Sequence, residues 1–329
     1  MDFKIIQNTM PIPSTCSRQS AVTIGNFDGC HLGHQTLINR IIEEADSSPM
    51  QRIAISFTPH PEMYFHPNKS QKLQNLFMSE QKSRAFSELG IDIHIEQEFN
   101  DDFSHLSREA FLENYLLASL QTKVIVVGEN FLFGYQRKGS ANWLKSQAQS
   151  KNLKVEVLPP SLFEDKPISS TRIRRALAEQ GDVEAAFKML GRPYLIDGII
   201  VKGKQLGRSI GIPTINLSET RQLTPKNGVY VGRVFLNKDL QTKASVMSLP
   251  NNSIPAVFNV GLRPTINNNE QQIKIEAHLL YGSWELDQLY GYSAGFYFQK
   301  RLRDEKKFAN LEELKIQINK DIHSAKMLF

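Results

Sequence analysis

The first half of the chain alternates short apolar runs with amphipathic segments. Five runs are rich in β-branched residues and nearly continuously apolar, namely VTIGNF, RIAISF, IDIHIE, KVIVVG and KVEVL. Such runs are typical of strands buried on both faces of a sheet. The segments between them carry apolar residues at three- and four-residue spacing, as at Phe111, Leu112, Tyr115, Leu116 and Leu120. The alternation predicts βαβ units, and therefore a parallel sheet with helices on both faces, where ligands bind beyond the carboxyl ends of the strands.

Beyond LGRPY, where Gly191 and Pro193 mark a break, the pattern changes to strands separated by Gly, Asn, Ser and Pro. The strand-like runs are YLIDGIIVKG, GVYVGRVFL, IPAVFNVG, QIKIEAHLLYG and YGYSAGFYFQKRL. They predict a small antiparallel barrel. The last segment is typical of a helix with Asn310 as N-cap and one apolar face, made of Leu311, Leu314, Ile318 and Ile322.

Two helical segments, residues 169–181 and 182–191, close the first region. A chain of 329 residues exceeds what one core usually organises. We therefore expect two domains, residues 1–185 and residues 186–329.

Composition narrows the class of protein. With 40% hydrophobic and 22% charged residues the chain resembles an ordinary globular protein, and its apolar runs are too short to span a membrane. Two cysteines, Cys16 and Cys30, are too few for a disulfide framework. The first residues lack the basic and apolar regions of a secretory signal. These features predict a soluble, cytoplasmic protein.

Charge is uneven along the chain. Residues 1–185 hold 19 Lys and Arg against 22 Asp and Glu, whereas the remainder holds 20 against 12. The basic second half could be a solvated surface, a nucleic-acid face or a field that attracts small polyanions. A nucleic-acid-binding module is disfavoured because aromatic residues do not interleave with a basic stripe. Charge alone does not choose among the rest.

The stretch GNFDGCHLGHQTLINR places His31 and His34 where a strand turns into a helix. A helix N-terminus presents free N–H groups and a partial positive charge, and the small Gly33 lets a ligand approach the backbone. Both imidazoles could therefore donate to phosphate oxygens. A metal site with Cys30, or simple packing, remains an alternative. The stretch has neither a G-x-G-x-x-G fingerprint nor a P-loop lysine.

Further candidates follow in chain order. Asn130 offers an amide, and Phe133 offers a flat surface for an adenine or flavin ring, although Phe133 could equally pack in the core. Hydroxyls stand ahead of a helix that carries Arg172 and could hold a polyphosphate with it, or could merely cap a basic surface helix. These hydroxyl residues are Ser169, Ser170 and Thr171.

The second half offers its own constellation. Gly203 and Gly207 allow close backbone approach to phosphate. Thr214 and Asn216 lie two residues apart on one side of an extended segment, so both could reach one Mg²⁺-ATP. Glu276 lies in the strand-like IEAHLL, where an exposed charge is the plainer interpretation for a single glutamate.

Four stretches of the first half resemble, in order, the segments of one family: GNFDGCHLGHQTL, SFTPHPEMYF, VVGENFLFGYQRKG and ISSTRIRRAL. A fifth, SEQKSRAFSELGID, resembles a further segment of it. In the second half three stretches do the same, GIIVKGKQLGRSIGIPTINL, NVGLRPTI and IEAHLL. Together they are similar to the bacterial FAD synthetases, the bifunctional riboflavin kinase/FMN adenylyltransferases.

The resemblance implies a Rossmann-like nucleotidyltransferase domain followed by a riboflavin-kinase barrel with a C-terminal helix. It implies Mg²⁺, ATP as co-substrate, and riboflavin, FMN, FAD and pyrophosphate as substrates and products. No nucleic acid, membrane or obligate protein partner is expected.

The resemblance also assigns residues. It makes Glu276 the base for the riboflavin hydroxyl, gives Mg²⁺ to Thr214 and Asn216, and makes Arg172 the phosphate-contacting arginine beside His31 and His34. Other residues are expected around ATP or the flavin, with His60 as a wall of the site: Gly25, Phe27, Asp28, Gly33, His60, Arg301 and Arg303.

One departure and one alternative remain. The family commonly has an Asp-Phe pair where Tyr281 and Gly282 begin a longer turn here, and this turn bears on the flavin contacts. The nearest alternative is a monofunctional enzyme, either a kinase or an adenylyltransferase with the other domain merely appended.

Overall fold

The chain forms two compact units, Met1–Ser169 and Ser170–Phe329 (unit 1 and unit 2). The computed structural model describes residues 3–8, 18–66, 74–203, 205–264 and 271–329. Cys16 and part of the NVGLRPTI stretch lie outside these ranges. The expected boundary after Ala185 stays a prediction, since the two units divide between Ser169 and Ser170.

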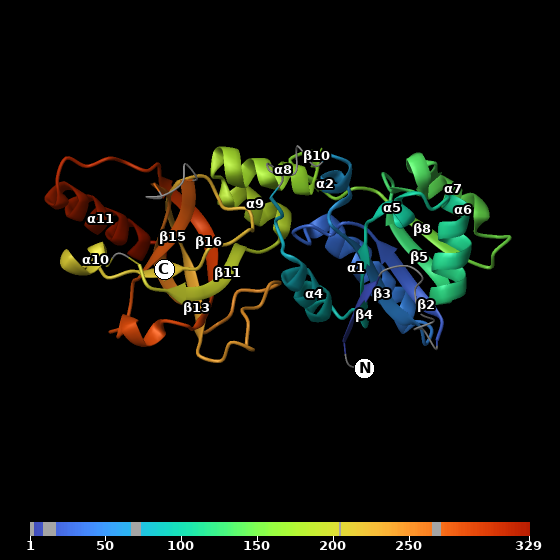
Figure 1. The fold of residues 1–329 in the computed structure, drawn as a ribbon, viewed down its shortest axis with the longest axis horizontal. Helices are drawn as coiled ribbons and strands as arrows, with labels where there is room; N and C mark the ends of the chain where they lie inside the picture. The colour runs from blue at the N-terminus through green and yellow to red at the C-terminus, as the bar shows by residue number, and fades with distance from the viewer. Residues whose placement is uncertain (1–2, 9–17, 67–73, 204, 265–270) are drawn as a thin grey trace. The chain divides into compact units, whose positions relative to one another are not determined.

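Unit 1 is built on a parallel six-stranded sheet, as the alternation predicted (Figure 1). The strand order is β1-β4-β3-β2-β5-β8. The strands are β1 (Lys4–Asn8), β2 (Ser20–Ile24), β3 (Gln51–Thr58), β4 (Ile93–Glu98), β5 (Thr122–Gly128) and β8 (Lys154–Leu158). The run VTIGNF indicated a strand through Phe27, but β2 ends at Ile24, and the edge strand β1 was not predicted.

Helices connect these strands (Figure 1). They are α1 (Leu32–Asp46), α2 (Pro61–Phe65), α4 (Ser79–Glu88), α5 (Asp101–Ser104), α6 (Arg108–Ala110), the π-helix η1 (Phe111–Ser119) and α7 (Ala141–Gln147). Short elements lie between β5 and α7 and after β8: β6 (Leu132–Phe133), η2 (Tyr135–Arg137), β7 (Gly139–Ser140), β9 (Leu162–Phe163) and β10 (Lys166–Pro167).

The two faces of the sheet differ in character. Ile93 and Ile95 of β4 join a buried apolar core with Tyr115 and other residues of η1 and α7. Side chains alternate along a strand, so His94 and Glu96 lie on the opposite face, where both are buried. Hydrogen bonds join this face to α4, because Ser83 of that helix contacts His94 at 2.8 Å.

Unit 2 opens with three helical segments, α8 (Ser170–Arg175), η3 (Ala176–Gln180) and α9 (Val183–Leu190). A closed antiparallel barrel follows, in the order β11-β12-β15-β14-β13-β16, and confirms the predicted barrel. Its strands are β11 (Tyr194–Val201), β12 (Ile215–Leu217), β13 (Gly228–Asn237), β14 (Ile254–Pro264), β15 (Gln271–Leu279) and β16 (Ser293–Arg303). Two short helices lie in its loops, α10 (Leu206–Ser209) and η4 (Leu286–Leu289).

The last element is the predicted helix, α11 (Leu311–Lys326), drawn in dark red in Figure 1. Asn310 is its N-cap, as expected, and the Asn310 side chain accepts a hydrogen bond from the Glu313 N–H at 2.9 Å. Inside the barrel, Phe258 stacks on Phe296 with ring centroids 5.2 Å apart. Aromatic side chains therefore form part of the packed interior of the barrel.

Candidate functional sites

His31 and His34 form a stacked pair at the start of α1. Their ring centroids are 3.6 Å apart and the rings are inclined by only 16°. His31 is the N-cap of the helix, and its Nδ1 accepts a hydrogen bond from the backbone N–H of His34 at 3.4 Å. The predicted strand–turn–helix junction is therefore present. Because α1 begins beside these imidazoles, its partial positive charge adds to their capacity to attract an anion.

Buried residues support this turn from beneath. The Asp28 carboxylate accepts hydrogen bonds from the N–H groups of Leu76 and Phe77, at 3.1 and 2.9 Å. Phe27 is fully buried, adopts a positive φ of 50°, and places its ring 5.1 Å from that of His34. Both residues thus occupy supporting positions, and a direct contact of either with a ligand stays a prediction.

Gly33 lies directly against the first histidine. A Cβ at position 33 would lie 3.3 Å from the ring of His31. Since few real Cβ contacts are so close, a side chain there would shift the His31 ring by a few tenths of an ångström. Gly33 therefore suits the observed position of the His31 ring.

A cavity of about 330 Å³ opens at the carboxyl ends of the unit 1 strands. Gly25 follows β2, Phe57 lies in β3, Phe99 follows β4, and Phe131 follows β5. We call it the aromatic cavity, since its other lining residues include Phe65, Phe103, Phe111, Phe133 and Tyr135. It lies where the parallel sheet predicts a ligand.

The aromatic pair of the VVGENFLFG stretch serves this cavity. Phe131 and Phe133 are nearly parallel, with centroids 5.3 Å apart. Phe133 is also part of the apolar core, so the packing and the lining interpretations both hold for it. Asn130 is exposed in the preceding turn and is not among the lining residues in the described part of the chain.

His60 begins the short helix α2. Its Nδ1 accepts a hydrogen bond from the N–H of Glu62 at 3.2 Å. The next residue, Pro61, lines the aromatic cavity. His60 itself is not among the described residues that line this cavity, so its role as a wall of the site stays a prediction.

The SSTRIR stretch lies where the chain passes from unit 1 to unit 2. α8 begins at Ser170, Thr171 is exposed, and Arg172 is half-buried. Ile173 is fully buried and anchors the helix. The roles of Ser169, Ser170, Thr171 and Arg172 in phosphate binding stay predictions.

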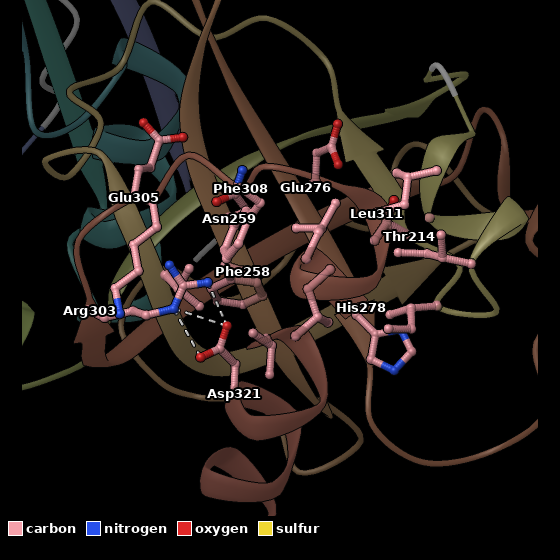
Figure 2. Close-up of a pocket in the computed structure, with 18 residues that line it drawn as sticks. Thr214, Phe258, Asn259, Glu276, His278, Arg303, Glu305, Phe308, Leu311 and Asp321 are labelled. Atoms are coloured by element: carbon pink, nitrogen blue, oxygen red, sulfur yellow. Dashed lines mark hydrogen bonds and ion pairs between the residues drawn. The ribbon is translucent and has the colours of Figure 1, made fainter. Parts of the chain in front are cut away.

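Unit 2 holds a second cavity of about 330 Å³ (Figure 2). Thr214 and Glu276 line it from the barrel, and residues of α11 line it from the other side. We call it the helix-covered cavity. Glu276 is half-buried, so a substrate can reach its carboxylate.

Strand register places two amides beside Glu276. Asn216 of β12 pairs with Glu276 on one side, and Asn259 of β14 pairs with it on the other. Opposite residues of an antiparallel pair share one face of the sheet. Sequence reasoning missed Asn259, whose only signal was its place at the start of the NVGLRPTI stretch.

Asn216 is 6% exposed, and its Oδ1 has no hydrogen-bond partner among the described residues. A buried amide oxygen without a partner costs free energy, so this atom fits a missing ligand. Gly203 packs against the same side chain, and a Cβ there would collide with it. A Cβ at Gly207 would collide with the carbonyl of Ile212. Both glycines are therefore sterically required.

His278 is a second residue that sequence reasoning did not assign. Its Nδ1 donates a hydrogen bond to the carbonyl oxygen of Pro213 at 2.9 Å. Pro213 precedes Thr214, so this bond fixes the segment that presents the Thr214 hydroxyl. The signal was its place two residues after Glu276 on the same strand face.

The two arginines of β16 lie in different surroundings. Arg303 lines the helix-covered cavity and holds Asp321 of α11, with Nη2 2.7 Å from Oδ2 (Figure 2). Arg301 instead donates to the carbonyl of Asn227 at 2.9 Å and pairs with Asp304 at 2.8 Å. It is not among the described residues that line this cavity, and its flavin role stays a prediction.

The predicted apolar face of α11 faces this cavity. Leu311, Leu314 and Ile318 line it together with Phe308. Leu311 is 59% exposed, which is unusual for one member of a helix's apolar face. The face therefore lines an accessible hollow, which can receive a flat apolar ring.

The comparisons with known proteins match each half of the chain to a family. The family model of FAD synthetase matches residues 14–172, and that of riboflavin kinase matches residues 190–329. Two relatives are named bifunctional riboflavin kinase/FMN adenylyltransferase. The relative from Buchnera aphidicola subsp. Schizaphis graminum is 34% identical over 94% of both chains. The relative from Escherichia coli K12 is 32% identical over 99% of this chain and 98% of the relative. The chain belongs to the bifunctional riboflavin kinase/FMN adenylyltransferase family.

A solved structure of the same fold is described as a macrolide-efflux protein from Streptococcus pneumoniae. It is 27% identical, with a TM-score of 0.83 over 98% of both chains. Within the described ranges of our chain, no helix is long and apolar enough to cross a membrane.

The turn after Leu280, which is expected from the sequence to differ from the family, contacts the glycine-rich loop. Arg208 and Asp287 form an ion pair at 2.9 Å, although both are exposed. The Gln205 amide also donates to the Tyr290 hydroxyl at 3.3 Å. This turn therefore helps to hold the loop that contains Gly207.

The two units differ in the side chains that could serve as metal ligands. In the described ranges no group of three His, Cys, Asp or Glu side chains could hold a metal ion. The alternative of a metal at Cys30, His31 and His34 therefore gains no support. In the kinase unit, a hydroxyl, an amide oxygen and substrate phosphates would instead suit Mg²⁺, which usually keeps several waters and few protein ligands.

Proposed function

We propose that this chain makes FAD from riboflavin in two ATP-dependent steps, with the kinase step in unit 2 and the adenylyl transfer in unit 1. The observation that carries the proposal is that both family models match in one chain, and each unit has its own cavity lined by residues assigned from the sequence.

In the kinase step, Glu276 takes the proton of the riboflavin 5′-hydroxyl. A bond forms between that oxygen and the γ-phosphorus of ATP, and the bond from the γ-phosphorus to the β,γ-bridging oxygen breaks. ADP leaves with the electron pair. The position of Glu276 in the helix-covered cavity supports this assignment.

Thr214 and Asn216 would hold Mg²⁺, and the buried Oδ1 of Asn216 without a partner fits that role. The bound ion would neutralise charge on the β- and γ-phosphates. The His278 bond to Pro213 keeps Thr214 in place. The glycine-rich loop around Gly207 would approach the phosphates through its backbone.

The flavin ring would occupy the space under α11. Leu311, Leu314 and Ile318 offer an apolar surface there, and Arg303 lies at its side. The Arg303–Asp321 ion pair ties the helix to the barrel, so this wall is held at a fixed distance.

In the adenylyl transfer, an oxygen of the FMN phosphate attacks the α-phosphorus of a second ATP. The bond to the α,β-bridging oxygen breaks and pyrophosphate leaves. The attacking phosphate is already anionic, so positioning and charge neutralisation suffice. Within unit 1, His31 and His34 would supply them, with Mg²⁺, while the aromatic cavity takes the flavin ring.

Localisation and partners follow from the same proposal. We place the protein in the cytoplasm, where its substrates are made, with ATP, riboflavin, FMN, FAD and pyrophosphate as its ligands. Neither nucleic acid nor an obligate protein partner is needed for either step.

Incubation of the purified protein with ATP, Mg²⁺ and riboflavin, followed by chromatographic separation of the flavins, tests the proposal. FMN should appear first and FAD later. Accumulation of FMN alone would leave a monofunctional kinase, and conversion of added FMN without use of riboflavin would leave a monofunctional adenylyltransferase. Salt-sensitive binding to an oligonucleotide without flavin turnover would overturn both activities.

A further inference from the structure

A buried polar cluster lies between α4 and the sheet of the adenylyltransferase unit, and neither proposed reaction uses it. On the sheet, β3 and β4 contribute a hydroxyl, an imidazole and a carboxylate. On α4, two hydroxyls and one ammonium face them. The cluster consists of Ser56, Ser79, Lys82, Ser83, His94 and Glu96.

Most members of this α4 cluster are paired at short distance. His94 lies between two serines, with Ser56 Oγ and Ser83 Oγ each 2.8 Å from one of its ring nitrogens. Ser79 donates to the carboxylate of Glu96. The polar contact found for Lys82 is looser, since its Nζ lies 3.5 Å from Ser56 Oγ.

Lys82 is the member without a close counter-charge. It is only 8% exposed, and lysine is almost never fully buried unless it is paired. Across the described ranges it forms no ion pair within 4.0 Å. Burial lowers the pKa of Lys82, while the charges of Asp28 and Glu96 act in the opposite direction. A charged side chain in such surroundings lowers the folding free energy gained by the protein. Buried ionisable groups of this kind are concentrated at functional sites.

The cluster is connected to the histidine turn through Asp28. This carboxylate, 3% exposed, holds the N–H groups of Leu76 and Phe77, just before α4 begins. Lys82 lies on the first turns of the same helix and interacts electrostatically with Asp28. Asp28 in turn begins the tight turn that leads into His31. The hydrogen bonds of Asp28 therefore tie the start of the helix that carries Lys82 to the base of the histidine pair.

We propose that Lys82 is a positioning residue for adenylyl transfer, which fixes the turn of His31 and His34 through the carboxylate of Asp28. The inference rests on the proposed function of unit 1. Lys82 acts without touching substrate, because its side chain is buried between α4 and the sheet. It acts by keeping the two imidazoles where charge develops on the phosphates.

The test compares Lys82→Met, which keeps the length of the side chain and removes its charge, with the wild-type chain. Conversion of FMN to FAD should lose about 10- to 100-fold in kcat, with little change of KM for ATP, because a small misplacement of catalytic groups has effects of that size. Riboflavin phosphorylation, measured in the same preparation, should remain within about twofold. Ser83→Ala is the matched control, since it removes the hydrogen bond to His94 on the same helix and leaves the charge. Its adenylylation kcat should be unchanged.

A double-mutant cycle tests the route. If Lys82 acts through Asp28, then Lys82→Met should lower kcat no further when Asp28→Asn is already present. Multiplied losses in the double variant would overturn the inference, as would equal kcat in Lys82→Met and wild type. Should Lys82→Met fail to fold, Lys82→Met with Glu96→Gln removes one charge of each sign and takes its place. Wild-type protein that makes no FAD from FMN would contradict the proposed function itself, whatever the variants do.

Discussion

Asn216 and Glu276 are register partners on β12 and β15, so one pair of strands presents the proposed magnesium ligand and the proposed base on the same face of the barrel. Their strands are joined by backbone hydrogen bonds, which fixes the separation of the two side chains. The proposed base and the proposed metal ligand are therefore held in a fixed register by the backbone hydrogen bonds of β12 and β15.

Glu276→Gln should separate the two activities. The amide cannot take a proton, and loss of a general base typically costs about 10²- to 10⁴-fold in rate. Riboflavin phosphorylation should fall by that amount, while conversion of added FMN to FAD stays at the wild-type rate. Chromatographic assay of both steps in one preparation checks this. An equal fall in both steps would contradict the division of labour between the units.

Asn216→Ala should raise the Mg²⁺ concentration needed for half-maximal kinase activity, by roughly tenfold, because a hard oxygen ligand is lost. Stability should change little through hydrogen bonding, since the Oδ1 atom makes none among the described residues. A Mg²⁺ titration of the kinase rate measures this. Asn259→Ala is the matched control on the other side of Glu276, and its Mg²⁺ requirement should not move. The same Mg²⁺ shift in both variants would argue against Asn216 as ligand.

His31 can be tested with two substitutions that differ in only one property. His31→Ala removes both the imidazole and the helix cap, and loss of a cap costs about 1 kcal/mol. His31→Asn restores a capping side chain but no imidazole. Both should slow adenylyl transfer by about 10²-fold or more, the effect of one lost oxyanion donor. Only His31→Ala should also lower stability. Recovery of the rate in His31→Asn would show that capping, and not phosphate contact, is the role of His31.

The stability of unit 1 should depend on the protonation of His94. Burial and the charge of Lys82 lower the pKa of His94 from 6.5 to about 3. The folded state therefore stays neutral while the unfolded state takes up a proton, so stability is full above pH 6.5 and falls as the pH drops toward about 3. Between pH 7 and pH 5 the loss should be about 2 kcal/mol.

Denaturation by urea at these two pH values measures the loss. The chain has two tryptophans, Trp143 in unit 1 and Trp284 in unit 2. Trp284→Phe therefore leaves a fluorescent probe of unit 1 alone. His94→Gln in this background should remove most of the pH-dependent loss, and an unchanged loss would mean that another group titrates.

Most of the fold could be predicted from the pattern of apolar and polar residues along the chain. Buried parallel strands differ from amphipathic helices in period, and the break near Gly191 separates that pattern from the barrel strands. Strand β1, at the start of the chain, could not be predicted in this way. It lies at the edge of the sheet, where fewer of its side chains need to be apolar, and Lys4, Gln7 and Asn8 interrupt its apolar run. The π-helix η1 was also invisible, since the spacing of Phe111 and Tyr115 suits an α-helix as well.

The candidate sites were predictable where a residue's neighbours in sequence are also its neighbours in space. His31 and His34 are one helical turn apart, so their pairing follows from local structure. Asn259 was missed because its place beside Glu276 depends on strand register, which the sequence does not display. Lys82 was missed for another reason: a lysine on a helix is normally exposed, and only the packed structure reveals that this one is buried.

The capping bond of His31 also determines where its ring proton lies. Because Nδ1 accepts the N–H of His34, it must keep its lone pair, and in the neutral ring the proton then resides on Nε2. The tautomer is thus selected by the start of the helix, before any nucleotide arrives. One nitrogen of the ring is used to begin α1, and the same bond determines that the other nitrogen carries the proton.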